Sequence, residues 1–442
     1  MKGKTIHINK EIPVRVETDV FVAGGGPAGV AAAVAAARNG CKVFLAEGTG
    51  CFGGMGTASL IPLFVTMTDG VSLVAAGFCE EIMNRMIDGG CIGSWYDVRI
   101  LPEVLKRIYD DIVTKAGVQY SFFTQVVDAA GHDGKIDYVV LHGKSGFYAV
   151  KAKIYIDCTG DADMAALAGA QYEKGDENGV MQPGTLCSQW AGIDWNTAVE
   201  MDHHGPLEQA FRDGVFSAPD RHIPGIFKSV GFMGNGSFGH AFGMDGTDER
   251  SLTEAIVSMR KIIPDYEKYY KNYLNGYENM VLVGTGSLMG VRETRRVVCD
   301  YRISLKDFVN RAEFEEDEIG RYCYPVDMHP SNASEEAYHE SERMFRRDYR
   351  YGKGETYGIP YRILTPLGFD NLLVAGRCVS SDRYMLASIR VMPACFITGQ
   401  AAGTAAAMTK DSENVRRIDT LLLRKKLREA GAYLPRYKRD YP

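Results

Sequence analysis

The sequence lacks the closely spaced cysteines that hold zinc ions or iron–sulfur clusters. It has ten cysteines, but no two of them form a C-x-x-C pair and none belongs to a C-x-x-H set. A site built on thiolates needs several such ligands close together. We therefore expect free thiols in a reducing compartment, with no metal ion and no iron–sulfur cluster.

Long hydrophobic runs and an excess of positive charge are also missing. No stretch reaches the length of a membrane span, and the N-terminal residues show neither an apolar segment nor a small-residue cleavage site. The net charge is −6, which gives no electrostatic footprint for nucleic acid. These features predict a cytoplasmic protein that binds neither membranes nor nucleic acid.

The first 50 residues show the pattern of a β–α–β unit. A β-branched strand is expected over 19–23, an alanine-rich helix over 27–39 with Gly40 at its C-terminal end, and a second strand over 42–46. The chain between the first strand and the helix reads Gly24-Gly25-Gly26-Pro27-Ala28-Gly29. The arrangement is typical of a nucleotide-binding α/β fold.

Within this unit, Gly24, Gly26 and Gly29 match the G-x-G-x-x-G fingerprint. The first glycine allows a tight turn, the second lets the backbone approach a pyrophosphate, and the third permits close packing of helix on strand. The helix N-terminus offers free N–H groups to the phosphates, with Ala28 in its first turn. Glu47 follows the second strand, where a carboxylate can bind a ribose hydroxyl. Together they predict a dinucleotide site.

Two other glycine clusters provide a comparison within the same chain. Gly234, Gly236 and Gly239 have the fingerprint spacing, and Gly284 with Gly286 follow an apolar run. Neither cluster is followed by a helical pattern, so we interpret both as loops. The lack of a second complete fingerprint argues against a separate NAD(P)H domain.

Three further segments favour FAD over other dinucleotides. The pair Gly53 and Gly54, with the hydroxyl of Thr57, could close on the pyrophosphate just after Glu47. Residues 118–156 alternate in polarity as in a β-meander. Val126 lies within them, and we expect it to contact the cofactor. The segment Thr159-Gly160-Asp161 follows a strand and is similar to the return segment of FAD-binding folds.

The C-terminal region carries a resemblance to a known family. It reads Asn371-Leu-Leu-Val-Ala-Gly-Arg-Cys-Val-Ser-Ser-Asp and then Ser388-Ile-Arg-Val-Met-Pro-Ala-Cys-Phe-Ile-Thr-Gly-Gln-Ala-Ala-Gly. These segments, together with Gly290-Val-Arg-Glu-Thr-Arg-Arg and Val326-Asp-Met-His, resemble bacterial FAD-dependent oxidoreductases related to fumarate reductase flavoproteins and to the flavin-binding subunit of heterodisulfide reductase. The chain lacks the clustered cysteines of the latter and the His-Thr-x-x-Ala-Gln-Gly-Gly run that carries a covalent flavin, so the resemblance implies noncovalent FAD.

The same region supplies further cofactor candidates. Gly376 and Arg377 end an expected strand, 371–375, where backbone can approach the ribityl-phosphate arm, and Ser388 is assigned to the cofactor as well. Glycines and alanines give the expected helix over 393–408 a slim face for close packing. The predicted fold is α/β: a Rossmann-like three-layer FAD-binding domain formed by residues 1–172 and 357–442, with an inserted, partly β substrate domain over 173–356.

Four side chains are candidates for the chemistry. Arg292 and Arg390 could clamp a substrate carboxylate bidentately, Arg390 could instead bind the flavin O2, and either residue could form a structural ion pair. His329 and His240 could carry a proton as neutral imidazoles, or could be hydrogen-bonded structural histidines.

These residues predict hydride transfer between noncovalently bound FAD and a small, oxygen-rich or anionic organic substrate. Three alternatives remain at this stage. A thiazole-synthase-like enzyme would use a sacrificial cysteine or a bound metal, an electron-transfer subunit would need a partner with iron–sulfur centres, and a non-catalytic flavoprotein would bind FAD without turnover.

Overall fold

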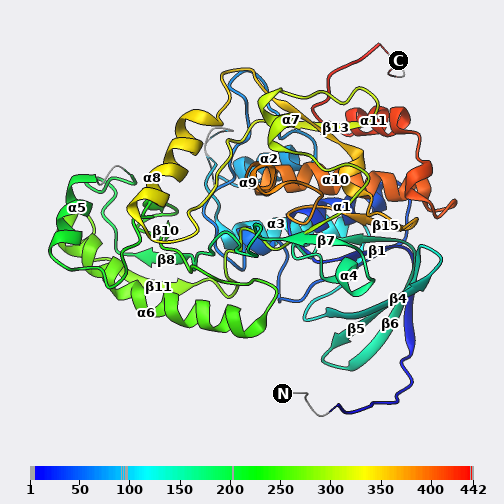
Figure 1. The fold of residues 1–442 in the computed structure, drawn as a ribbon, viewed down its shortest axis with the longest axis horizontal. Coiled ribbons are helices and arrows are strands. Elements are labelled where there is room, and N and C mark those ends of the chain that lie inside the picture. Colours follow the sequence, from blue (N-terminus) through cyan, green and yellow to red (C-terminus); the bar gives the residue numbers. More distant parts are fainter. Residues whose placement is uncertain are drawn as a thin grey trace.

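A computed structural model describes residues 5–90, 92, 94, 98–201, 204–438 and 440 (Figure 1). Its largest sheet has seven strands. Five of them run parallel in the order β3, β2, β1, β6 and β15. Their bounds are Gln119–Ser121, Val43–Ala46, Val14–Ala23, Gly146–Asp157 and Leu372–Val374. The sheet joins segments from both ends of the chain.

The sheet is the middle of three layers because its strands are buried on both faces. In β1, Val20 and Val22 face a helical layer, whereas Phe21 and Ala23 face the opposite side. The helical layer contains α1 (Pro27–Arg38), α2 (Phe78–Asp88), α3 (Pro102–Lys115) and α10 (Met392–Thr409). The other layer is the antiparallel meander of β4 (Gln125–His132), β5 (Lys135–Gly143) and the first part of β6, seen at the lower right of Figure 1. The predicted three-layer α/β fold is confirmed.

Helices α1 and α10 cross closely because α10 presents glycines to α1. A Cβ atom on Gly399 would lie 2.2 Å from the carbonyl oxygen of Ala28, and one on Gly403 would lie 2.0 Å from that of Ala32. These distances leave no room for any side chain. The slim face predicted for this helix is therefore confirmed, and it brings Gly399, about two turns into α10, beside the start of α1.

The middle of the chain forms a second sheet with its own core, at the left of Figure 1. The strand order is β11, β8, β10, β9, and helices α5 and α6 complete the unit. Their bounds are Val281–Thr285, Ser188–Ala191, Gly234–Gly236, Ile226–Lys228, His204–Arg212 and Glu249–Tyr273. The core of this unit runs from Leu186 to Met289. This core is narrower than the expected insertion over 173–356.

The remainder of the expected insertion packs on the helical layer. Buried residues between Ile303 and Tyr357 share one core with α1 and α10. Strand β13 (Glu318–Tyr322) pairs there with β14 (Tyr357–Pro360). The other elements are β7 (Tyr172–Lys174), β12 (Arg295–Val297), α4 (Asp163–Leu167), α7 (Leu305–Val309), α8 (Glu335–Arg343), α9 (Arg383–Ile389) and α11 (Thr420–Glu429).

The two glycine clusters interpreted as loops belong partly to strands, so that interpretation was wrong in part. Gly234 and Gly236 form β10, and Gly284 lies in β11. A Cβ atom on Gly234 would lie 2.4 Å from the side chain of Ile226, so only glycine fits at this position of the sheet. Neither strand leads directly into a helix, since α6 begins only at Glu249 and the element after β11 is the strand β12 (Arg295–Val297).

Candidate functional site: a cavity at the glycine turn

Most of the predicted site residues line one cavity. It measures about 350 Å³ and lies where the carboxyl ends of β1 and β6 meet the N-termini of α1 and α10. This is the position at which open parallel sheets bind ligands. The predicted residues in its wall are Gly24, Gly26, Ala28, Glu47, Gly54, Gly160, Asp161, Arg292, Gly376, Arg377 and Arg390.

The glycine turn has the shape that the fingerprint predicts. Gly24 adopts a φ of +89°, and a Cβ atom there would lie 2.6 Å from the carbonyl oxygen of Cys158. A Cβ atom on Gly29 would lie 1.8 Å from the carbonyl oxygen of Gly24, which explains its packing role. Gly26 differs, because a Cβ atom there would meet nothing within 4 Å and Gly26 lines the cavity. The space beside Gly26 is thus free for a ligand that approaches the backbone.

Glu47 and the second glycine pair are held against this turn. The Glu47 carboxylate accepts hydrogen bonds from the backbone N–H groups of Gly25 at 2.7 Å and Thr49 at 2.7 Å. The N–H of Gly53 donates to the carbonyl oxygen of Gly25 at 2.8 Å. A Cβ atom on Gly54 would lie 3.3 Å from the Cα atom of Gly26, so this segment closes directly on the turn.

The loop after β6 is organised by a buried carboxylate, Asp157. It accepts bonds from the N–H and the hydroxyl of Thr159 and from the N–H of Ala165. The next residues reach the opposite wall of the cavity, since Asp161 pairs with Arg377 at 2.8 Å. Asp157 therefore fixes the loop that carries two of the predicted cofactor residues, and sequence reasoning did not single it out.

Five predicted cofactor residues do not line the cavity. Gly29 and Gly53 support the turn, as described above. The hydroxyl of Thr57 is fully buried and donates to the carbonyl oxygen of Phe52 at 2.6 Å. Val126 lies on β4, and Ser388 is buried and bonded to the carbonyl oxygen of Tyr324 at 2.5 Å.

Both predicted arginines lie in the cavity wall and have donor capacity to spare. Arg292 Nη1 donates to the carbonyl oxygen of Pro183 at 2.8 Å and to the hydroxyl of Thr185 at 2.9 Å. No carboxylate of the described residues pairs with it within 4.0 Å. Burial and the nearby Arg390 lower the pKa of Arg292 to about 10, so it remains a cation at neutral pH.

Asp327 accepts only part of the hydrogen bonds that the Arg390 guanidinium can donate. Its Nη2 donates to the backbone carbonyl oxygen of that residue at 3.0 Å and lies 3.5 Å from the carboxylate. Its buried Nε has no hydrogen-bond partner among the described residues. A buried donor of this kind calls for an acceptor.

The predicted histidines do not line the cavity but contact each other. His240 Nε2 lies 2.8 Å from His329 Nδ1. A third histidine, His222, stacks on His240 with ring centroids 4.2 Å apart. Sequence reasoning missed His222 because the three residues come from distant segments, although Asp220 and Asp327 each stand two positions before a histidine.

A family model described as FAD dependent oxidoreductase matches residues 19–428. The chain belongs to this family. It is an FAD-dependent oxidoreductase with a Rossmann-like nucleotide-binding core, so the non-catalytic alternative is set aside. No curated protein matches the chain. The family model is broader than the two groups named in the sequence analysis. It therefore does not show that this chain is a relative of fumarate reductase flavoproteins or of the flavin-binding subunit of heterodisulfide reductase in particular.

Solved structures resemble this oxidoreductase only distantly. A geranylgeranyl bacteriochlorophyll reductase-like protein from Thermoplasma acidophilum has 12% identity and a TM-score of 0.47, with 94% of this chain and 84% of that chain covered. The p-nitrophenol 4-monooxygenase from Pseudomonas putida has 11% identity and a TM-score of 0.47, with 94% and 87% covered. A flavin-dependent brominase triple mutant has 11% identity and a TM-score of 0.46, with 93% and 84% covered. Similarity at this level gives no information about substrate.

The cavity residues fit FAD on structural grounds. Gly26 opens into the cavity without a neighbour, and α1 begins there with no side chain capping its N–H groups. Two cysteines also line this cavity, but burial raises the pKa of Cys395 to about 12 and that of Cys158 well above its usual value. Neither thiol is therefore a ready nucleophile, which weighs against sacrificial-cysteine chemistry.

Among the described residues, no single helix has the length and composition to cross a membrane. Helices α9 and α10 reach that length and composition only when they are counted as one segment, and the chain bends by 91° between them.

Proposed function

We propose that this oxidoreductase transfers hydride between noncovalently bound FAD and a small anionic or oxygen-rich organic molecule. The observation that carries the proposal is that two guanidinium groups, Arg292 and Arg390, line the same cavity as Gly26 and Glu47. FAD, when bound, supplies the hydride acceptor or donor. The residues of this chain bind and orient the two molecules.

In this proposal the cofactor lies along the cavity wall. The backbone at Gly24 and Gly26 and the N-terminus of α1 bind the pyrophosphate, because they offer N–H groups and a partial positive charge. Glu47 binds a ribose hydroxyl, and the backbone at Gly376 and Arg377 contacts the ribityl-phosphate arm. The likeness of the C-terminal segment to fumarate reductase flavoproteins supports this arrangement.

The substrate is then held by charge and by directed hydrogen bonds. Arg292 lacks a carboxylate partner among the described residues, and the Nε of Arg390 lacks an acceptor. A substrate carboxylate would satisfy both groups, because a guanidinium binds it bidentately. His329 and His240 were candidates for proton transfer, but they lie outside the cavity wall and the proposal does not depend on them.

The test is an anaerobic screen that follows flavin bleaching. Each candidate carboxylate is paired with its neutral amide, so that charge is the only large difference. We expect carboxylates to bleach the flavin faster, and Arg292→Lys to raise their KM about tenfold with FAD still bound. Arg296→Lys is the matched control, because Arg296 is buried and paired with Glu293 outside the cavity wall. Equal rates for acids and amides would contradict the proposal.

The nine cysteines described by the structure are all free. Cys91 lies outside the described residues. Free thiols support the proposed cytoplasmic location.

A further inference from the structure

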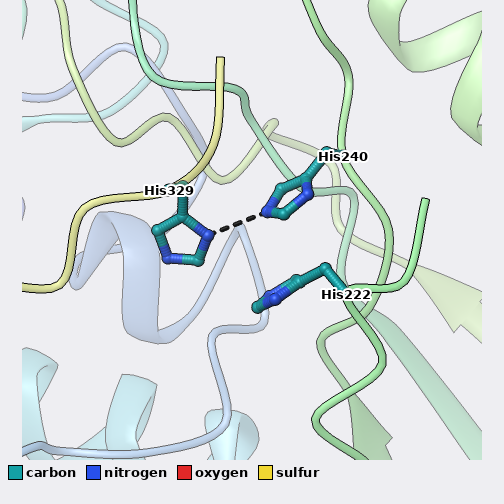
Figure 2. Close-up of side chains that lie close together, drawn as sticks. All are labelled: His222, His240 and His329. Atoms are coloured by element: carbon teal, nitrogen blue, oxygen red, sulfur yellow. Dashed lines mark hydrogen bonds between the residues drawn. The ribbon is translucent and has the colours of Figure 1, made fainter. Parts of the chain in front are cut away.

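Three histidines from separate loops meet at one point, beyond the cavity described above. Figure 2 shows the imidazoles of His222, His240 and His329 turned toward one another. His222 precedes β9, His240 follows β10 and His329 follows β13. One nitrogen of each ring lies within 4.8 Å of the others. His329 stands edge-on to both of the other rings.

A carboxylate lies beside the outer nitrogen of two of these rings. His240 Nδ1 lies 3.1 Å from the carboxylate of Asp220, and His329 Nε2 lies 3.4 Å from that of Asp327. A carboxylate accepts a hydrogen bond, so it draws the imidazole proton to the outer nitrogen. The inner nitrogens of both rings, 2.8 Å apart, are then left with lone pairs that face each other. Such a pair either shares a proton in a hydrogen bond or binds a metal ion that lies to one side of the line joining the two atoms.

The surroundings oppose an extra proton. His240 and His329 are buried and His222 is half-buried, so a charged imidazolium would lose most of its hydration here. Neutral imidazole is the form that binds transition metals. The guanidinium of Arg292 acts against any cation here, and the carboxylates of Asp220 and Asp327 act in its favour.

We propose that His222, His240 and His329 bind a divalent first-row transition-metal ion, with Asp220 and Asp327 as hydrogen-bond acceptors that orient two of the rings. Metal-binding histidines commonly donate their second N–H to a carboxylate in this way. Nitrogens 2.8 Å apart can both bind an ion at about 2.0–2.1 Å with an angle of roughly 85° at the ion. That angle suits a six-coordinate site with positions open for water or a small anion.

Metal binding at this site does not require the proposed substrate chemistry, and the proposal departs from the expectation of no metal. That expectation was based on cysteine spacing, which does not report on histidines brought together by folding. Asp327 connects the two places, since its backbone carbonyl oxygen accepts a bond from Arg390 in the cavity wall. Metal affinity can nevertheless be measured without any substrate.

The experiment uses the FAD-containing protein, stripped of metal with a chelator and titrated with Co²⁺ and with Zn²⁺ by calorimetry. We expect one ion per chain. His240→Ala should weaken binding at least ~100-fold, and Asp220→Asn, which alters only the orienting carboxylate, about 10–100-fold. His132→Ala is the matched control, because His132 also pairs with a carboxylate, Asp137, but lies exposed on β4.

His222→Gln provides a second variant in case His240→Ala fails to fold, since His222 is only half-buried. The flavin spectrum and the melting temperature report on folding in every variant. Loss of saturable binding in His222→Gln, with the flavin spectrum intact, supports the site. Absence of saturable binding in the wild type, or equal affinity in His222→Gln, overturns it and leaves a proton shared between His240 and His329.

Discussion

The glycine turn and the histidine cluster are built in opposite ways. The turn uses residues that are neighbours in sequence, and its contacts are between backbone atoms, as between Gly29 and Gly24. The cluster uses side chains far apart in sequence, such as His240 and His329, which are separated by 89 positions. A backbone site therefore leaves a continuous pattern in the sequence, whereas a side-chain site leaves only scattered residues.

Among the variants of the glycine turn, the largest effect is expected for Gly26→Val. The new side chain would project into the cavity rather than against protein, because nothing lies within 4 Å of a Cβ atom at Gly26. We expect FAD affinity to fall by ~100-fold or more, with the melting temperature of the stripped protein little changed. Flavin absorbance per chain measures the first effect and a thermal melt measures the second.

Gly284→Val is the matched control for this variant. Gly284 also has open space at its Cβ position, but it lies in β11, where a β-branched residue is favourable. Full flavin occupancy in Gly26→Val would show that the ligand does not approach the backbone there.

A second test concerns the helix crossing that supports the turn. In Gly403→Ala the added methyl group would meet the carbonyl oxygen of Ala32 at 2.0 Å, so α1 and α10 must move apart. We expect a loss of about 1–3 kcal/mol in the free energy of unfolding, measured by denaturant titration, because overpacked cores must shift backbone. An unchanged midpoint would mean that the two helices do not cross as closely as described.

The smallest effect is expected in the inserted unit. Asp248 caps α6 by accepting the N–H of Ser251 at 2.8 Å, and Asp248→Ala should cost about 1 kcal/mol. Because α6 belongs to a separate core, its amides should exchange several-fold faster while those of α1 do not change. Hydrogen exchange measures both at once, and an equal increase in α1 would show that the two cores unfold as one.

The sequence predicted the fold best where residues act locally. The parallel strands, the helix after the glycine turn, most of the meander expected over 118–156 and the slim helix at the C-terminus all have periodic or glycine-marked patterns. The meander itself begins at Gln125, because 119–121 form a parallel strand of the main sheet. The loop interpretation of Gly234 was wrong because a glycine in a strand looks the same in sequence as one in a turn. Only the packing of Ile226 against it shows why glycine is there.

The sequence predicted those parts of the site in which backbone atoms face the cavity, because glycine motifs mark them. The cavity wall at Gly26, Glu47 and Arg377 follows from motifs. By contrast, the hydroxyl of Thr57 looked suited to a ligand, yet it bonds to the backbone of Phe52, a choice that depends on local geometry. His222 could not be found from spacing, because its neighbours in space come from the segments after β10 and after β13.

The central claim is that the cavity at Gly26 holds FAD without a covalent bond. The direct measurement is to denature the purified yellow protein mildly and to identify the released nucleotide by chromatography and absorbance. We expect intact FAD in solution, about one per chain, and colourless protein in the precipitate. Flavin that remains on the precipitated chain, or released NAD with no flavin absorbance, would contradict the account.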